Sequence, residues 1–175
     1  MRSKPAIAFF LAFAAFVAVP AEAQSIGLGA GIVDLEQDDK TPLFLTANFR
    51  VRLFGPITLE PEVGYWKRTE QVAAGELSFE DFSVGANALL VIPGSKLEFF
   101  AGVGLGAHFL DRTAGIAGII RDANDTDVAV HLLGGLDLKV SSSVSLFAAA
   151  RHDSFGDDTD ARDQTKFYGG LRFRF

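Results

Sequence analysis

The residues of this chain that could do chemistry begin with its three histidines. Two of them, His108 and His131, fall on the same face of two alternating segments, 97–110 and 128–140, and could be neighbours across two strands. Two imidazoles make a partial transition-metal site, but zinc takes three or four protein ligands. The sequence shows no third ligand near them. We therefore expect both histidines to be structural, and we predict no metal and no cofactor.

The third histidine, His152, is followed two residues later by Ser154 in the stretch "RHDSF" (151–155). Residues two apart share one face of a strand, so the pair could supply a base and a nucleophile. A serine nucleophile also needs its base to be oriented by a third group within hydrogen-bond reach, and the sequence places none on this face. A strand that runs into its loop is the expected interpretation.

Two glycine-rich and two acidic stretches also suggest ligand sites. "GLGAG" (27–31) and "GVGLG" (102–106) would need a strand before them and a helix after them to bind a nucleotide, and no helix pattern follows either. The acidic stretches "DANDTD" (122–127) and "DSFGDDTDARD" (153–163) lack the EF-hand spacing of glycine and glutamate. We expect strand glycines and solvated loops, with weak divalent-cation binding by the acids as the alternative.

The segments that position these residues alternate apolar and polar side chains with a period of two, which is typical of strands. Three connections between segments are short turns and four are long and polar, and the two kinds alternate. The segments are 25–33, 43–53, 57–66, 79–92, 97–110, 128–140, 144–155 and 165–175. Turns at one rim and loops at the other predict an all-β fold, an eight-stranded antiparallel up-and-down transmembrane β-barrel.

The two faces of these segments differ in character. One face carries no charged residue and includes Leu105, Leu132 and Phe173, whereas the opposite face carries the charges of the strands. The interior of an eight-stranded barrel has room for few large side chains. The apolar face must therefore point outward, and lipid is the solvent that tolerates it.

The charged face then lines a narrow lumen, where we predict a network of ion pairs. Arg50 is expected opposite Glu60 across a turn centred near Gly55, because paired charges avoid the desolvation penalty of lone buried ones. The predicted network consists of Arg50, Arg52, Glu60, Glu62, Glu98, Asp137, Lys139, Arg151, Arg172 and Arg174. We expect a plug rather than a channel, since eight strands barely leave room for side chains. Pro61 lies mid-strand, removes a ladder donor and predicts a bulge.

Residues 1–23 have the pattern of a cleaved secretory signal. Arg2 and Lys4 precede an apolar run, 6–19, and an A-x-A motif ends at Ala23. We expect a single barrel domain, 24–175, after cleavage. The formal net charge of −6 argues against nucleic acid as a partner, because its binders carry basic patches. The chain has no cysteine, so no disulfide supports the fold.

With its strands placed, the chain resembles the small outer-membrane β-barrel family of the OmpA transmembrane domain, OmpX and OmpW-like proteins. "FFAGVGLGAHF" (99–109) is similar to the glycine-rich fifth strand of that family, and "SLFAAARHDSF" (145–155) to its seventh. "YGGLRFRF" looks like the family's C-terminal assembly signal, carried here by Tyr168, Leu171, Phe173 and Phe175. The resemblance implies insertion into a Gram-negative outer membrane by the barrel assembly machinery. We also expect a monomer, and no peptidoglycan-binding domain after the barrel.

The leading functional hypothesis is a non-enzymatic barrel with a structural or surface-interaction role. Its four predicted loops, 34–42, 67–80, 111–127 and 156–164, carry more acids than bases. Lipopolysaccharide bridged by divalent cations, or a basic partner, is the expected contact. A narrow porin for small or apolar solutes, which the OmpW resemblance implies, is one alternative.

A lipid A-modifying enzyme that uses His152 and Ser154 is the second alternative. The "RHDSF" stretch resembles the outward-facing His-x-Ser of outer-membrane lipid A deacylases. Phe155 stands where those enzymes carry an asparagine, and the acidic partner of their site is not evident in this sequence.

Overall fold

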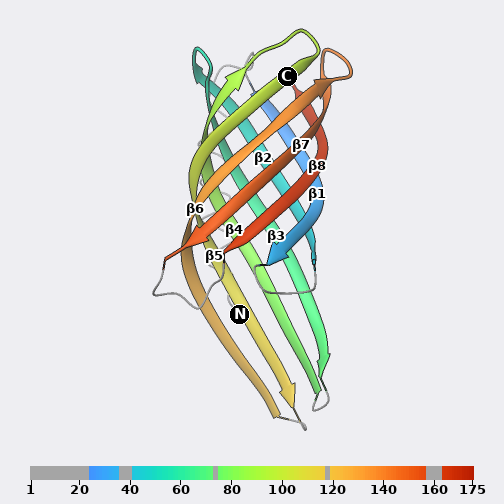
Figure 1. Cartoon of the computed structure of the whole chain (residues 1–175), viewed down its shortest axis with the longest axis vertical. Coiled ribbons are helices and arrows are strands. Elements are labelled where there is room, and N and C mark those ends of the chain that lie inside the picture. The colour runs from blue at the N-terminus through green and yellow to red at the C-terminus, as the bar shows by residue number, and fades with distance from the viewer. Residues whose placement is uncertain (1–23, 36–40, 73–74, 117–118, 157–162) are drawn as a thin grey trace.

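The computed structural model describes residues 24–35, 41–72, 75–116, 119–156 and 163–175, and there eight antiparallel strands form a closed barrel (Figure 1). The strands are β1 (Gln24–Leu35), β2 (Leu43–Phe54), β3 (Ile57–Val72), β4 (Gly75–Ile92), β5 (Leu97–Ile116), β6 (Ile119–Lys139), β7 (Val144–Phe155) and β8 (Gln164–Arg174). Each strand pairs with its neighbours in sequence, and β8 closes the barrel on β1. The predicted fold class is confirmed.

The predicted signal segment, 1–23, lies outside the described residues. Among the described residues, no helix has the length and apolar character to cross a membrane.

Three tight turns join β2 to β3, β4 to β5 and β6 to β7, as the sequence predicts. The first turn uses Gly55, whose φ of 51° lies in the left-handed region that glycine adopts without strain. Figure 1 shows these turns at one end of the barrel, together with the end of β8. We call this end the turn side and the opposite end the loop side.

The outer surface of the barrel is a belt of large apolar side chains. Leu105 is 61% exposed, Leu132 62% and Val103 57%. A soluble monomer rarely exposes an apolar patch larger than a few hundred Å², whereas exposed large apolar residues of this belt come from seven of the eight strands, all but β3. The surface therefore fits a hydrocarbon environment, as the alternation predicts.

Two of the predicted long loops are not loops. β3 and β4 stay paired from the barrel to Val72 opposite Gly75, and β5 and β6 stay paired to Ile116 opposite Ile119. The prediction of polar loops at 67–80 and 111–127 was therefore wrong. Figure 1 shows these four strands reaching well beyond β1, β2, β7 and β8 on the loop side. We call these two segments the four-strand extension.

Polar cross-strand contacts join β3 and β4 within the four-strand extension. Lys67 Nζ lies 3.4 Å from Glu80 Oε2, and Gln71 donates to Glu76 at 2.7 Å. Charged and amide side chains stabilise a strand pair when they oppose each other in this way. The period-two pattern is weak here because neither face needs to meet lipid, and so the sequence suggested loops.

Pro61 sits in a regular part of β3. It lies opposite Ala86 of β4 in an unbroken register, so the predicted bulge at Pro61 was wrong. The register of β2 against β3 shifts between Arg52 and Phe54 instead, beside the turn. A proline in a strand lacks one ladder N–H but requires no inserted residue.

Candidate functional site

The lumen is filled by charged side chains that pair across it. On the turn side, Asp137 of β6 accepts hydrogen bonds from Arg50 of β2 at 2.7 Å and from Arg172 of β8 at 3.1 Å. Glu60 of β3 lies 2.5 Å from Arg50 and 3.6 Å from Arg172. Arg172 also donates to Asn48 Oδ1 at 2.9 Å. These contacts join walls that are far apart in the strand order, so they cross the lumen.

A second cluster lies deeper toward the loop side. Arg151 of β7 pairs with Glu62 of β3, and its Nε lies 2.7 Å from Asp153 Oδ1. Lys166 of β8 donates to Asp153 Oδ2 at 2.6 Å, and the Tyr168 hydroxyl donates to Glu62 at 3.4 Å. All five side chains are buried. A buried charge without a partner carries a large desolvation penalty, and each charge of this cluster has one.

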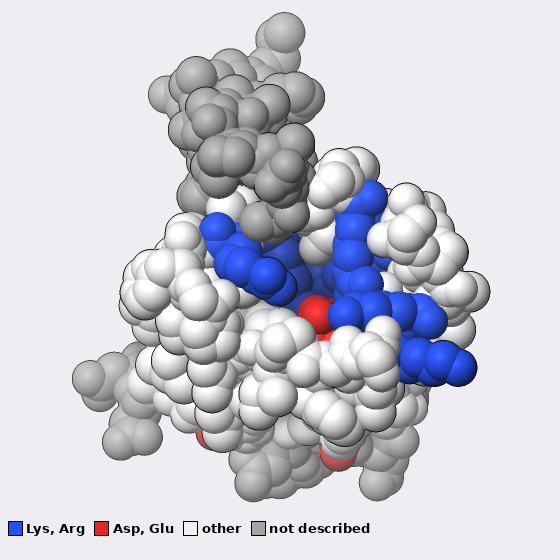
Figure 2. Space-filling model, turned by 90° about the horizontal axis from the view of Figure 1, so that it is seen from above, with Lys and Arg blue, Asp and Glu red and all other residues white. Residues whose placement is uncertain are grey.

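The turn-side mouth of the lumen is open to water. A polar cavity of about 210 Å³ lies there, with Glu98 at 3.5 Å from Lys139 and 3.6 Å from Arg174. Arg52 lines the same cavity and is exposed. Figure 2, which looks onto this end, shows Lys and Arg side chains around a hollow that holds an acidic side chain.

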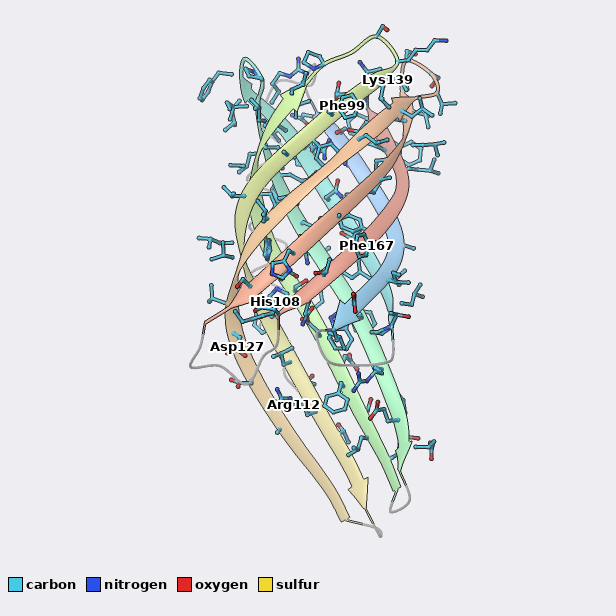
Figure 3. The ribbon with its side chains drawn as sticks, viewed as in Figure 1. Phe99, His108, Arg112, Asp127, Lys139 and Phe167 are labelled. Carbon is cyan, nitrogen blue, oxygen red and sulfur yellow. The ribbon has the colours of Figure 1, made fainter. Side chains whose placement is uncertain are left out.

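Two buried histidines occupy the loop-side end of the lumen. His108 lies near the level at which the four-strand extension leaves the barrel (Figure 3). Its Nδ1 is 2.9 Å from Asp81 Oδ2, and Nδ1 of His131 is 3.1 Å from Asn87 Oδ1. The histidines are offset in the β5–β6 register, where His108 lies opposite Asp127. Their rings nevertheless meet edge to face, with centroids 6.0 Å apart.

Nine of the ten residues of the predicted network take part in ion pairs, and Arg52 does not among the described residues. Three further charged residues join the network, Asp81, Asp153 and Lys166, which the predicted list of the network did not include. The alternation puts all three on the lumen face. The sequence of a single strand does not reveal which side chains from distant strands lie opposite, so their partners could not be found in this way.

The outer surface near the loop rim brings an acid to the two residues of the enzymatic hypothesis. Ser154 Oγ donates to Asp163 Oδ2 at 3.3 Å, and His152 Nε2 lies 3.8 Å from the same oxygen. His152 Nδ1 is 3.0 Å from Thr165 Oγ1. The structure thus supplies the third group that the sequence did not show. The group beside the serine is the carboxylate and not the imidazole.

The residues of the predicted assembly signal lie on both faces of β8 and at the residue that follows it. Leu171, Phe173 and Phe175 are exposed on the outer surface. Tyr168 points into the lumen, where it meets the ring of Phe44 edge to face. Their role in assembly stays a prediction.

Comparisons with known proteins bear on the fold. No protein-family model and no curated protein sequence matches the chain. Among solved structures, Neisserial surface protein A aligns with a TM-score of 0.67 at 16% identity over 87% of this chain and 96% of that one. Ail of Yersinia pestis aligns with a TM-score of 0.61 at 14% identity over 87% and 97%. A major outer membrane protein of Thermus thermophilus aligns with a TM-score of 0.65 at 12% identity, over 87% of this chain and 100% of that one.

The chain has the fold of the small eight-stranded outer-membrane β-barrels. In such a barrel the outward apolar belt meets lipid and the closed ladder leaves no unpaired strand edge in the hydrocarbon. Fold and belt together place this barrel in an outer membrane. The identities are too low to carry an activity from these proteins to this one.

Proposed function

We propose that this outer-membrane barrel is a non-enzymatic protein with a sealed lumen that acts through the surface on its loop side. The observation that carries the proposal is the set of buried ion pairs across the lumen, such as Arg50 with Asp137 and Arg151 with Glu62. A narrow pore needs a continuous watery path. Charged side chains held at hydrogen-bond distance from opposite walls occupy the space that such a path would need, which supports a sealed lumen.

Conductance in planar bilayers tests the sealed lumen. The purified barrel is expected to give no stepwise current above that of detergent alone. Reproducible single-channel steps would contradict the sealed lumen and favour the alternative, transport of small solutes. A transport function would also require the buried pairs to open, and we would then expect neutralising Asp137 to change the size of the steps.

The loop-side surface supports a contact with cations or with a basic partner. The acids Asp34, Asp111 and Asp125 are exposed there, and the sequence of the loop-side connections carries an excess of acids. The similar Ail structure is a complex with the heparin analogue sucrose octasulfate, which is a sulfated ligand. Acidic residues repel such a ligand. We therefore infer lipopolysaccharide bridged by divalent cations, or a positively charged protein, as the partner of this chain.

A triple variant, Asp34→Asn, Asp111→Asn and Asp125→Asn, tests this contact. Binding of lipopolysaccharide in calcium is expected to weaken in the triple variant and to disappear when the calcium is chelated. Lys67→Gln is the matched control, because it changes the charge of the same surface in the opposite direction and should not weaken calcium-dependent binding. Equal binding by the triple variant and the unmodified barrel would rule out these acids as the contact.

The second candidate function, lipid modification, is favoured by one observation. Asp163 lies within reach of both Ser154 and His152 on the lipid-facing side of the loop rim. A carboxylate that orients a serine or a histidine is a recurring part of nucleophilic sites. Mass spectrometry of lipid A from cells with the barrel, without it, and with Ser154→Ala decides the matter. A loss of acyl chains that depends on Ser154 would establish an enzymatic activity. Unchanged lipid A would rule out the lipid-modification hypothesis.

A further inference from the structure

The two lumen histidines point their free nitrogens toward one carboxylate. Nε2 of His108 lies 3.9 Å from Asp153 Oδ2, and Nε2 of His131 lies 3.8 Å from Asp153 Oδ1. The three side chains come from β5, β6 and β7 and offer ligand atoms that all lie within 4.8 Å of one another. All three are buried, at 0%, 1% and 0% exposure.

The Nδ1 nitrogen of each ring already has a hydrogen-bond partner. The Asp81 carboxylate accepts from Nδ1 of His108, and Asn87 Oδ1 accepts from Nδ1 of His131. In the neutral imidazole each Nε2 then carries the lone pair, and neither Nε2 has a hydrogen-bond partner among the described residues. Metal-ligating histidines usually donate their second ring N–H to a carboxylate or carbonyl in this way. Buried polar atoms without a partner are rare and call for an explanation.

The space around the two rings is close to the size that a metal needs. Tetrahedral ligands at about 2.0–2.2 Å from a metal ion lie about 3.4 Å apart. The two nitrogen–oxygen distances, 3.8 and 3.9 Å, exceed this value by about half an ångström, and the three ligand atoms lie within 4.8 Å of one another. Binding one ion therefore requires side-chain rotations that bring the three ligand atoms closer together. Gly85 and Gly106 make room for the ring of His131, since a Cβ at Gly106 would lie 2.6 Å from its Nε2.

Two cations share the Asp153 carboxylate with any metal bound here, because Arg151 Nε lies 2.7 Å from Oδ1 and Lys166 donates to Oδ2 at 2.6 Å. Asp81, Asp153 and Glu62 face Arg151 and Lys166 in this part of the lumen. The three acids outnumber the two cations, so a bound dication changes the local net charge from −1 to +1. Imidazole nitrogens select zinc, copper, iron or nickel over calcium and magnesium, which prefer oxygen ligands.

We propose that His108, His131 and Asp153 form a binding site for a divalent transition metal inside the lumen. The sequence analysis found two of these ligands and lacked the third, which comes from β7. A metal bound here would join β5, β6 and β7 at the loop-side end of the barrel. The proposal is independent of the surface contact proposed above.

Zinc binding to the refolded, metal-free barrel tests the site. Calorimetric titration in detergent should show one zinc ion per chain, and excess calcium should not displace it. His108→Gln and His131→Gln are each expected to weaken zinc binding at least tenfold. His152→Gln is the matched control, because it removes the one other histidine, which lies on the outer surface, and should leave the affinity unchanged. A barrel that binds no stoichiometric zinc, or loses it only in the His152 variant, overturns the proposal.

A second measurement covers the case in which a lumen variant does not fold. Heat-dependent mobility in SDS gels identifies folded barrels, and only folded variants are compared. X-ray absorption of the zinc-loaded unmodified barrel reports the ligands directly. Two imidazoles and a carboxylate in the first shell support the site, and a shell with fewer than two imidazoles refutes it.

Discussion

The substitution Asp137→Asn tests whether buried charges hold the barrel walls together. Asp137 is 0% exposed and contacts Arg50 at 2.7 Å and Arg172 at 3.1 Å. Opposite charges about 4 Å apart at an effective dielectric constant of about 20 interact by about 4 kcal/mol, so the two pairs amount to about 8 kcal/mol. Asparagine avoids the desolvation cost of the carboxylate, and Glu60 stays beside both guanidiniums. We expect the free energy of unfolding to fall by about 3–5 kcal/mol, the range for breaking a buried pair.

Urea unfolding in detergent measures this loss. Trp66 is the single tryptophan of the chain and donates to Asp81 in the lumen at 3.0 Å, so its fluorescence reports on the network. Glu98→Gln is the control, because Glu98 also faces two cations, but at 3.5 and 3.6 Å and beside the turn-side cavity. It should cost clearly less than Asp137→Asn, because these longer contacts are weaker. If Asp137→Asn costs no more than Glu98→Gln, the buried pairs do not hold the walls.

Two further predictions concern the inside and the outside of the wall. Gly106→Ala should lower the free energy of unfolding by about 1–3 kcal/mol through overpacking, since its Cβ would meet His131, whereas Gly134→Ala should be near neutral because the nearest atom would be 3.6 Å away. Equal free energies of unfolding for the two glycine variants would contradict the packing argument. Leu105→Arg, near the middle of the belt, should cost about 2–4 kcal/mol, and Leu53→Arg, beside the turn, about 0–1 kcal/mol. Unfolding in lipid vesicles measures both, and equal costs would refute the depth dependence.

The barrel was predictable from the sequence because its signals are local. Val130, Leu132 and His131 alternate between lipid and lumen within a few residues, and this period needs no knowledge of the other strands. The contact of Arg50 with Glu60 was predictable for a similar reason. A short turn sets the register of the two strands that it joins, and the prediction of this one pair followed from counting back from the turn.

The rest depends on geometry that single segments do not contain. Arg50 and Asp137 are 87 residues apart in sequence and meet only because the strands tilt around a closed barrel. The third member of the histidine cluster, Asp153, was hidden for the same reason. The four-strand extension was missed because its strands leave the lipid, where the alternation of apolar and polar residues is no longer required.

The ion pairs of the lumen also favour the native strand register over shifted registers that would expose the same apolar residues to lipid. A slip of one strand by two residues keeps every apolar side chain outside, so alternation alone does not distinguish the native pairing from its neighbours. Such a slip of β8 would move Arg172 by about 6.6–6.8 Å along the barrel, away from Asp137 on β6 and Asn48 on β2. Arg172 therefore contacts strands on both sides of the closure between β8 and β1. These contacts form only in the native register, so the filled lumen favours correct closure of the barrel.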